Sequence, residues 1–74
     1  MSEINGFKVT NHFSIKAQQR NLFNRIKDTL DKGKYFKQKD GYAIYVYQDV
    51  KVVVSELESL LITCMHCYRK FKKY

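Results

Sequence analysis

The order of apolar and polar residues divides this chain into a helical first half and a β-rich second half. Residues 6–10 alternate apolar Phe7 and Val9 with polar neighbours, which predicts a short N-terminal strand. Apolar residues then recur at the three- and four-residue spacing of an amphipathic helix. The buried stripe predicted from this spacing contains Ile15, Leu22, Ile26 and Leu30, with Phe23 beside it.

The helical region has signals for an internal break and for an end. Asn21 or Asn24 can interrupt the helix and cap a second one, so the region predicts either one helix or two. Lys32 followed by Gly33 is typical of a helix C-terminus, where a cation and then a glycine are favoured.

From Lys34 onward the pattern favours strands. Asp40-Gly41 is a two-residue hairpin turn signal, and the segment 42–47 after it is rich in β-branched and aromatic residues. A turn centred on Asp40 and Gly41 also predicts the register of the hairpin. The predicted cross-strand pairs are Phe36 with Tyr45 and Tyr35 with Val46.

The rest of the second half contains one clear strand and one ambiguous segment. Gln48-Asp49 forms a weaker turn signal, and the valine-rich segment 50–54 predicts the next strand. Residues 56–59 form a connection. Residues 60–67 fit a helix by their leucines and a strand by Ile62 and Thr63, so the pattern alone leaves both open. The chain as a whole is therefore predicted to be α+β.

Length and charge limit the classes of function. The chain has 74 residues, which predicts a single domain over 1–74 with a basic tail at 69–74. Its net charge of +7 and pI of about 9.5 predict attraction to a polyanion, which can be RNA, DNA, an acidic protein or an anionic membrane. No apolar run approaches the roughly 20 residues of a membrane span, and no signal peptide is visible. We therefore expect a cytoplasmic protein that does not bind a membrane.

The cysteines do not indicate a metal site. Both lie in Cys64-Met65-His66-Cys67, and in a strand residues three apart face opposite sides. A structural zinc site usually needs four ligands, and this is the one Cys-x-x-Cys pair. We expect reduced thiols, one of them buried, and no metal or other cofactor.

The sharpest candidate chemistry lies at the start of the helical region. His12, Lys16 and Arg20 are spaced by four residues, so on an α-helix they fan across about 80° of one surface. A group that titrates near neutrality then stands beside two fixed positive charges, which suits a phosphodiester. The competing interpretation is a solvated basic helix face with an incidental histidine.

Aromatic and basic residues later in the chain are candidates for nucleic-acid contacts. Tyr45 and Tyr47 share one strand face and can stack bases, although aromatic residues in such places more often belong to the core. The tail interleaves cations with aromatic rings, a combination that stacks bases and neutralises phosphates, and a frayed soluble terminus is the alternative. The tail candidates are Tyr68, Arg69 and Lys70.

The run Thr10-x-His12 with Lys16 and Arg20, followed by a helix that ends at Gly33, resembles a small bacterial family of unassigned function. Members of that family open with a Thr-x-His-Ala-x-x-Arg-x-x-x-Arg helix and finish with an antiparallel sheet. The family is grouped with the RelE-like and BrnT-like toxins of the barnase-like ribonuclease fold. The resemblance extends from about Phe7 to Arg69.

The resemblance implies a RelE-like fold, with a short N-terminal strand, one or two helices and a three- to four-stranded antiparallel sheet. It favours a strand for residues 60–67, and it implies further RNA contacts from Thr63, Tyr68 and Arg69. The chain departs from the family at Phe13, where a small residue is usual, at Lys16, where arginine is usual, and at Asn21, where glycine is usual.

Three functions follow as hypotheses. The first is a metal-independent endoribonuclease toxin with catalytic His12, Lys16 and Arg20, which uses the RNA 2′-hydroxyl as nucleophile and is paired with an acidic antitoxin protein. The second is a non-catalytic nucleic-acid-binding protein with the same basic surface. The third is a small inhibitor or adaptor of phage type that binds a protein or ribonucleoprotein.

Overall fold

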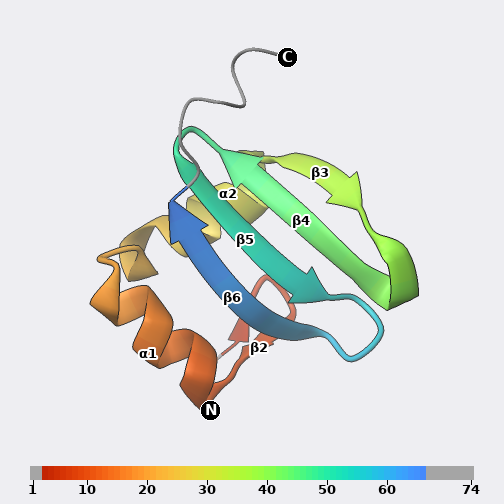
Figure 1. The fold of residues 1–74 in the computed structure, drawn as a ribbon, viewed down its shortest axis with the longest axis horizontal. Helices are drawn as coiled ribbons and strands as arrows, with labels where there is room; N and C mark the ends of the chain where they lie inside the picture. Colours follow the sequence, from red (N-terminus) through yellow and green to blue (C-terminus); the bar gives the residue numbers. More distant parts are fainter. Residues whose placement is uncertain (1–2, 67–74) are drawn as a thin grey trace.

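The computed structural model describes residues 3–66 and shows an α+β chain, as predicted (Figure 1). The helical elements are α1 (Asn11–Gln19), α2 (Ile26–Lys32) and two short 3-10 helices, η1 (Phe23–Arg25) and η2 (Lys39–Gly41). The strands are β1 (Glu3–Ile4), β2 (Phe7–Val9), β3 (Lys34–Lys37), β4 (Tyr42–Tyr47), β5 (Val50–Ser55) and β6 (Leu60–His66). Residues 60–66 thus form a strand, the choice that the resemblance favours.

The sheet has six strands in the order β1-β2-β6-β5-β4-β3. Strands β3 to β6 form an antiparallel meander, whereas β2 runs parallel to β6. The predicted antiparallel sheet after the helices corresponds to β3 to β6, but the complete sheet has six strands and includes one parallel pairing, which the prediction lacked. The additional strand belongs to an N-terminal hairpin, in which Asn5 and Gly6 both take positive φ and join β1 to β2.

Both helices pack on one face of the sheet, α1 along β6 and α2 behind β4 and β5 (Figure 1). The core lies between these layers, and its largest fully buried side chains include Phe13, Leu22 and Ile26. In the part of the chain that the structure describes, no helix covers the other side, which we call the open face. Its side chains along β3 to β6 include Lys34, Phe36, Ile44, Val46, Lys51, Val53, Thr63 and Met65.

The predicted helical stripe is wrong in its first member. Ile15 is 55% exposed, and the buried residues of α1 are Phe13 and Ala17. The helix ends at Gln19 with Arg20 as its C-cap, and Asn21 takes a φ of 57°, so the chain turns before the stripe continues at Leu22. A periodic count across this break loses its phase. Of the two predicted break positions, Asn21 and Asn24, the structure has the break at Asn21.

The hairpin between β3 and β4 closes with three residues rather than the predicted two. Asp40 and Gly41 have φ values of 59° and 81°, and Lys39 is the additional loop residue. On either side of this loop, the Gln38 N–H donates to the Tyr42 carbonyl oxygen at 2.8 Å.

The additional loop residue shifts the register of the hairpin by one. Phe36 lies opposite Ile44 rather than Tyr45, and Tyr35 lies opposite Tyr45 rather than Val46. Because side chains alternate along a strand, this shift moves Phe36 from the helix-covered face to the open face.

Candidate nucleic-acid interface

Thr10 fixes the start of α1 against the sheet. Its hydroxyl accepts a hydrogen bond from the Phe13 N–H at 3.1 Å, which caps the first turn, and donates to the Leu61 carbonyl oxygen at 3.4 Å. Phe13 and Ala17 are completely buried. These anchors determine which side of α1 is turned toward the sheet and which side toward solvent.

His12, Lys16 and the C-cap residue Arg20 follow one flank of α1, next to the side that carries the buried Phe13, and we call it the α1 basic flank. His12 and Arg20 are exposed, and Lys16 is half-buried. The three Cα positions rise by about 6 Å at each step along a helix. Because helical side chains tilt toward the N-terminus, Lys16 and Arg20 lean toward His12. The flank can therefore present all three groups to one extended anion.

The charged side chains of this flank form no ion pair among the described residues. Within residues 3–66, no hydrogen bond or ion pair engages the side chains of His12, Lys16 or Arg20. By contrast, Arg25 and Lys27 each form an ion pair with an aspartate 3.0 Å away. A phosphate can thus meet the flank without breaking an existing pair. Lys16 and Arg20 also lie at the helix C-terminus, where cations stabilise the helix dipole, so their position has a structural explanation as well.

A charged cluster that the sequence patterns did not indicate meets the C-terminal end of α1. One oxygen of the Asp49 carboxylate lies 3.0 Å from the Arg25 guanidinium, and the other lies 4.0 Å from the Nδ1 of His66. The Nε2 of His66 lies 3.3 Å from the Arg20 carbonyl oxygen. The hydrogen bond from Arg25 holds the pKa of Asp49 below its usual value. The cluster joins the β4–β5 turn, the end of β6 and the end of α1.

Tyr45 and Tyr47 share one face of β4, and this is the helix-covered face. The Tyr45 ring packs edge-on against Phe7 and Tyr35, with centroid distances of 6.4 and 5.4 Å. Burial raises the pKa of the Tyr45 hydroxyl, and the nearby Glu56 carboxylate raises it further. Both rings that contact Tyr45 belong to the same chain, which favours the interpretation of Tyr45 as a packing residue. Its role in base stacking stays a prediction.

The remaining candidates are separated from the α1 basic flank. Thr63 is half-buried opposite Val53 on the open face, so the sheet lies between it and the flank. Tyr68, Arg69 and Lys70 lie outside the described residues. The structure thus gathers the three predicted catalytic residues on one helix and places Thr63 on the other side of the sheet.

Cys64 is a free and completely buried thiol. Burial raises its pKa, and the charge of Arg20 opposes this rise in part. A buried thiol with a raised pKa is a poor nucleophile and a poor metal ligand. Among residues 3–66, no group of three or more histidine, cysteine, aspartate or glutamate side chains is arranged to hold a metal ion.

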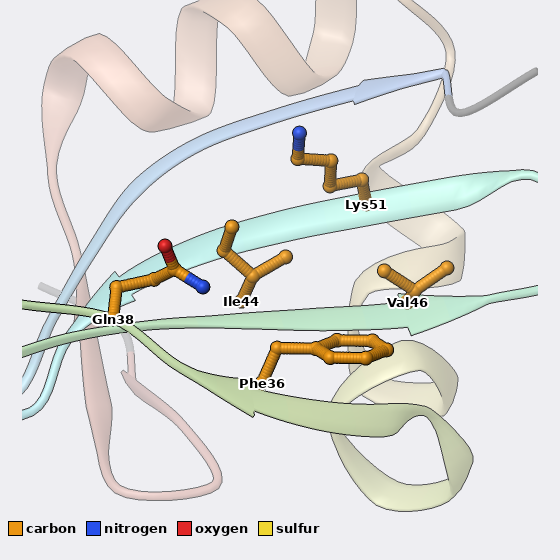
Figure 2. Close-up of a pocket in the computed structure, with 5 residues that line it drawn as sticks. All are labelled: Phe36, Gln38, Ile44, Val46 and Lys51. Atoms are coloured by element: carbon orange, nitrogen blue, oxygen red, sulfur yellow. The ribbon is translucent and has the colours of Figure 1, made fainter. Parts of the chain in front are cut away.

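The open face carries a pocket of about 190 Å³, shown in Figure 2. Its side chains project from β3, β4, β5 and the β3–β4 loop on the same side of the sheet. Three of them are apolar, one ends in an amide and one in an ammonium group. They are Phe36, Ile44, Val46, Gln38 and Lys51. None of the predicted catalytic residues lines this pocket.

Comparisons with known proteins give no relative for this chain: no family model, no curated protein and no solved structure matches it. The RelE-like resemblance therefore stays a prediction. Among the described residues, no helix is both long enough and apolar enough to span a membrane.

Proposed function

We propose that this chain binds RNA on the α1 basic flank and cleaves it without a metal ion, as an endoribonuclease toxin. The observation that carries the proposal is that exposed His12 and Arg20 and half-buried Lys16 share one flank of α1, and that their side chains have no partner within residues 3–66. The net charge of +7 supports a polyanionic substrate, because it draws RNA to the surface before any specific contact forms.

The proposed reaction is attack by the RNA 2′-hydroxyl on the adjacent phosphorus. The bond between the 2′-oxygen and phosphorus forms as the bond to the 5′-oxygen breaks, which leaves a cyclic phosphate and a 5′-hydroxyl. His12 accepts the proton of the 2′-hydroxyl, and the leaving oxygen takes up a proton from Lys16 or from water. Lys16 and Arg20 balance the charge that develops on the phosphate oxygens.

Purified protein is expected to cut single-stranded RNA in the presence of EDTA and to leave cyclic phosphate ends. His12→Ala should lower the rate by about a hundredfold or more, because it removes the proton acceptor. Gln18→Ala is the matched control, since Gln18 is also exposed on α1 and carries no titratable group. Equal rates for the two variants would exclude His12 from the reaction.

A second candidate function is nucleic-acid binding without cleavage. The observation that favours it is the shape of the site: the α1 basic flank is the outer surface of a helix, and the pocket on the open face includes none of its residues. Binding by about three phosphate contacts predicts a slope of about −2 for log K against log salt concentration on single strands. Binding with that slope, and no cyclic phosphate product, would favour this candidate over the toxin.

The toxin proposal also includes an acidic antitoxin partner. Expression of the chain alone should arrest bacterial growth, and co-expression of an acidic protein encoded beside it should restore growth. Growth arrest that persists unchanged in His12→Ala would separate toxicity from the proposed cleavage.

A further inference from the structure

Strand β3 forms one edge of the sheet and is exposed along its whole length. The segment from Lys32 to Lys39 contains four lysines and no carboxylate. An exposed edge strand offers unpaired backbone groups to another chain. Here four lysines surround that edge, and one carboxylate, that of Glu56, accepts a hydrogen bond from the Tyr35 hydroxyl at 2.8 Å.

The free backbone groups of this edge can be assigned from the register. Gln38 donates its N–H to Tyr42, the residue opposite it, and hydrogen-bonded pairs alternate along an antiparallel ladder. Phe36 therefore exchanges its backbone hydrogen bonds with Ile44, two residues further along. The N–H and carbonyl groups of the alternate residues, Tyr35 and Lys37, point away from β4 and toward solvent.

The pocket on the open face lies beside this edge. Phe36 lines the pocket from β3 and is 43% exposed. A strand added to β3 would place every second side chain on the open face, next to Phe36. The pocket is smaller than typical sites for drug-sized ligands, which have volumes of about 300 to 1,000 Å³. Its size suits a single apolar side chain.

We propose that β3 and the adjoining pocket form a docking site for an extended acidic segment of a partner protein. The segment adds to the sheet through the backbone of Tyr35 and Lys37, and one of its apolar side chains enters the pocket beside Phe36. In an alternating segment the carboxylates then lie on the other face of the added strand, where the Lys37 side chain also lies. This site is independent of the proposed RNA site, because the residues of the two do not overlap.

The lysines also decide against a second copy of this chain as the occupant. Pairing β3 with β3 of another copy would place two lysine-rich edges side by side, and repulsion between their like charges opposes this pairing. Edge lysines commonly protect a sheet from such self-association. The same charges attract a strand that carries glutamate or aspartate.

The test uses the whole chain and a short capped peptide that alternates glutamate with valine, with binding followed by NMR titration. Lys37→Pro removes the outward N–H, and Lys37→Gln is the matched control, because it removes the same charge and keeps the N–H. Proline is tolerated where an edge N–H faces solvent. Lys37→Pro should bind the peptide about five- to tenfold more weakly than Lys37→Gln.

The pocket is tested in the same way. Phe36→Ala should weaken peptide binding about tenfold. Leu57→Ala should leave it unchanged, because Leu57 is a 79% exposed apolar residue in the connection between β5 and β6. Equal loss in both variants would show that apolar surface in general, and not the pocket, binds the peptide.

Amide hydrogen exchange of the unaltered protein keeps the proposal testable if Lys37→Pro fails to fold. Added peptide should slow exchange at Tyr35 and Lys37, whereas the Phe36 amide should be slow with or without it. Unchanged exchange at Tyr35 and Lys37 would overturn the proposal. Two further outcomes would replace the occupant: single-stranded RNA that binds in place of the peptide and shifts Phe36, or a dimer of the free chain that Lys37→Pro dissociates.

Discussion

The two faces of the sheet differ in how completely they are packed, and β5 displays the difference within adjacent residues. Val52 points to the helix-covered face and is completely buried, whereas Val53 points to the open face and is half-buried. On the covered face the neighbouring residues Ala43 and Cys64 are also completely buried. On the open face Phe36 stays 43% exposed.

This difference separates the residues that hold the fold together from those available for contacts. Burial against α1 and α2 supplies most of the hydrophobic stabilisation, because it removes complete side chains from water. The open face combines partly exposed apolar groups with lysines. It can therefore contact another molecule without loss of the core.

The sharpest way to break the comparison is to truncate one phenylalanine from each side. Phe13→Ala should lower the free energy of unfolding by about 3–5 kcal/mol, because Phe13 is completely buried on the covered side. Phe36→Ala should lower it by about 1 kcal/mol or less, since its ring keeps much of its contact with water. Urea denaturation measures both values. Equal losses would contradict the division between the faces.

A smaller effect is expected within one strand. Val52→Ala should cost about 2–3 kcal/mol of unfolding free energy, and Val53→Ala about 1 kcal/mol or less, because the two side chains lie on opposite faces of β5. The two variants share the same backbone, strand and change in β-propensity. A larger loss for Val53→Ala in thermal or urea unfolding would mean that the open face is covered in solution.

The smallest effect is on the pH dependence of stability, and it arises where the ends of α1 and β6 meet the β4–β5 turn. The hydrogen bond from Arg25 lowers the pKa of Asp49 below its ordinary value of 3.8. The ionised carboxylate therefore stabilises the fold above that pH, and this contribution is lost as the pH falls through the lowered pKa. Asp49→Asn should reduce the loss of unfolding free energy on the acid side of the stability curve. Above about pH 5 to 6 this pair contributes little pH dependence, because the carboxylate is fully ionised there.

Lys27 forms an ion pair with Asp31, four residues on in α2, and Asp31→Asn tests the same effect at a second pair. The pKa of Asp31 is also lowered, by its hydrogen bonds from Lys27 and Asn5, so both variants should flatten the acid limb of the curve. An Asp49→Asn variant as stable as the unaltered protein at about pH 6 would contradict the stabilising role of the pair with Arg25.

Local signals predicted most of the elements. The break at Asn21, the helix end at Gly33 and the turn at Gln48-Asp49 all appear where the sequence places them. Gly33 is needed for a different reason from the predicted one. Its φ of −73° is ordinary, but an added Cβ would contact the Thr29 carbonyl oxygen and lie 2.8 Å from that of Val46.

Features that depend on register or on distant residues could not be predicted. The β3–β4 loop differs by one residue from the two-residue turn that Asp40-Gly41 indicates, and that single residue decides the face of Phe36. The contact between Arg25 and Asp49 joins residues 24 positions apart. No local pattern records such a contact, because it exists only once the strands are paired.

The most direct test maps where RNA contacts the protein. The isotope-labelled chain is titrated in EDTA with single-stranded RNA whose 2′-hydroxyls are methylated, so that it binds but cannot be cleaved. The account predicts the largest NMR shift changes at His12, Lys16 and Arg20, with Phe36 and Val46 unchanged. Shift changes centred on Phe36, Val46 and Lys51, with α1 unaffected, would contradict it.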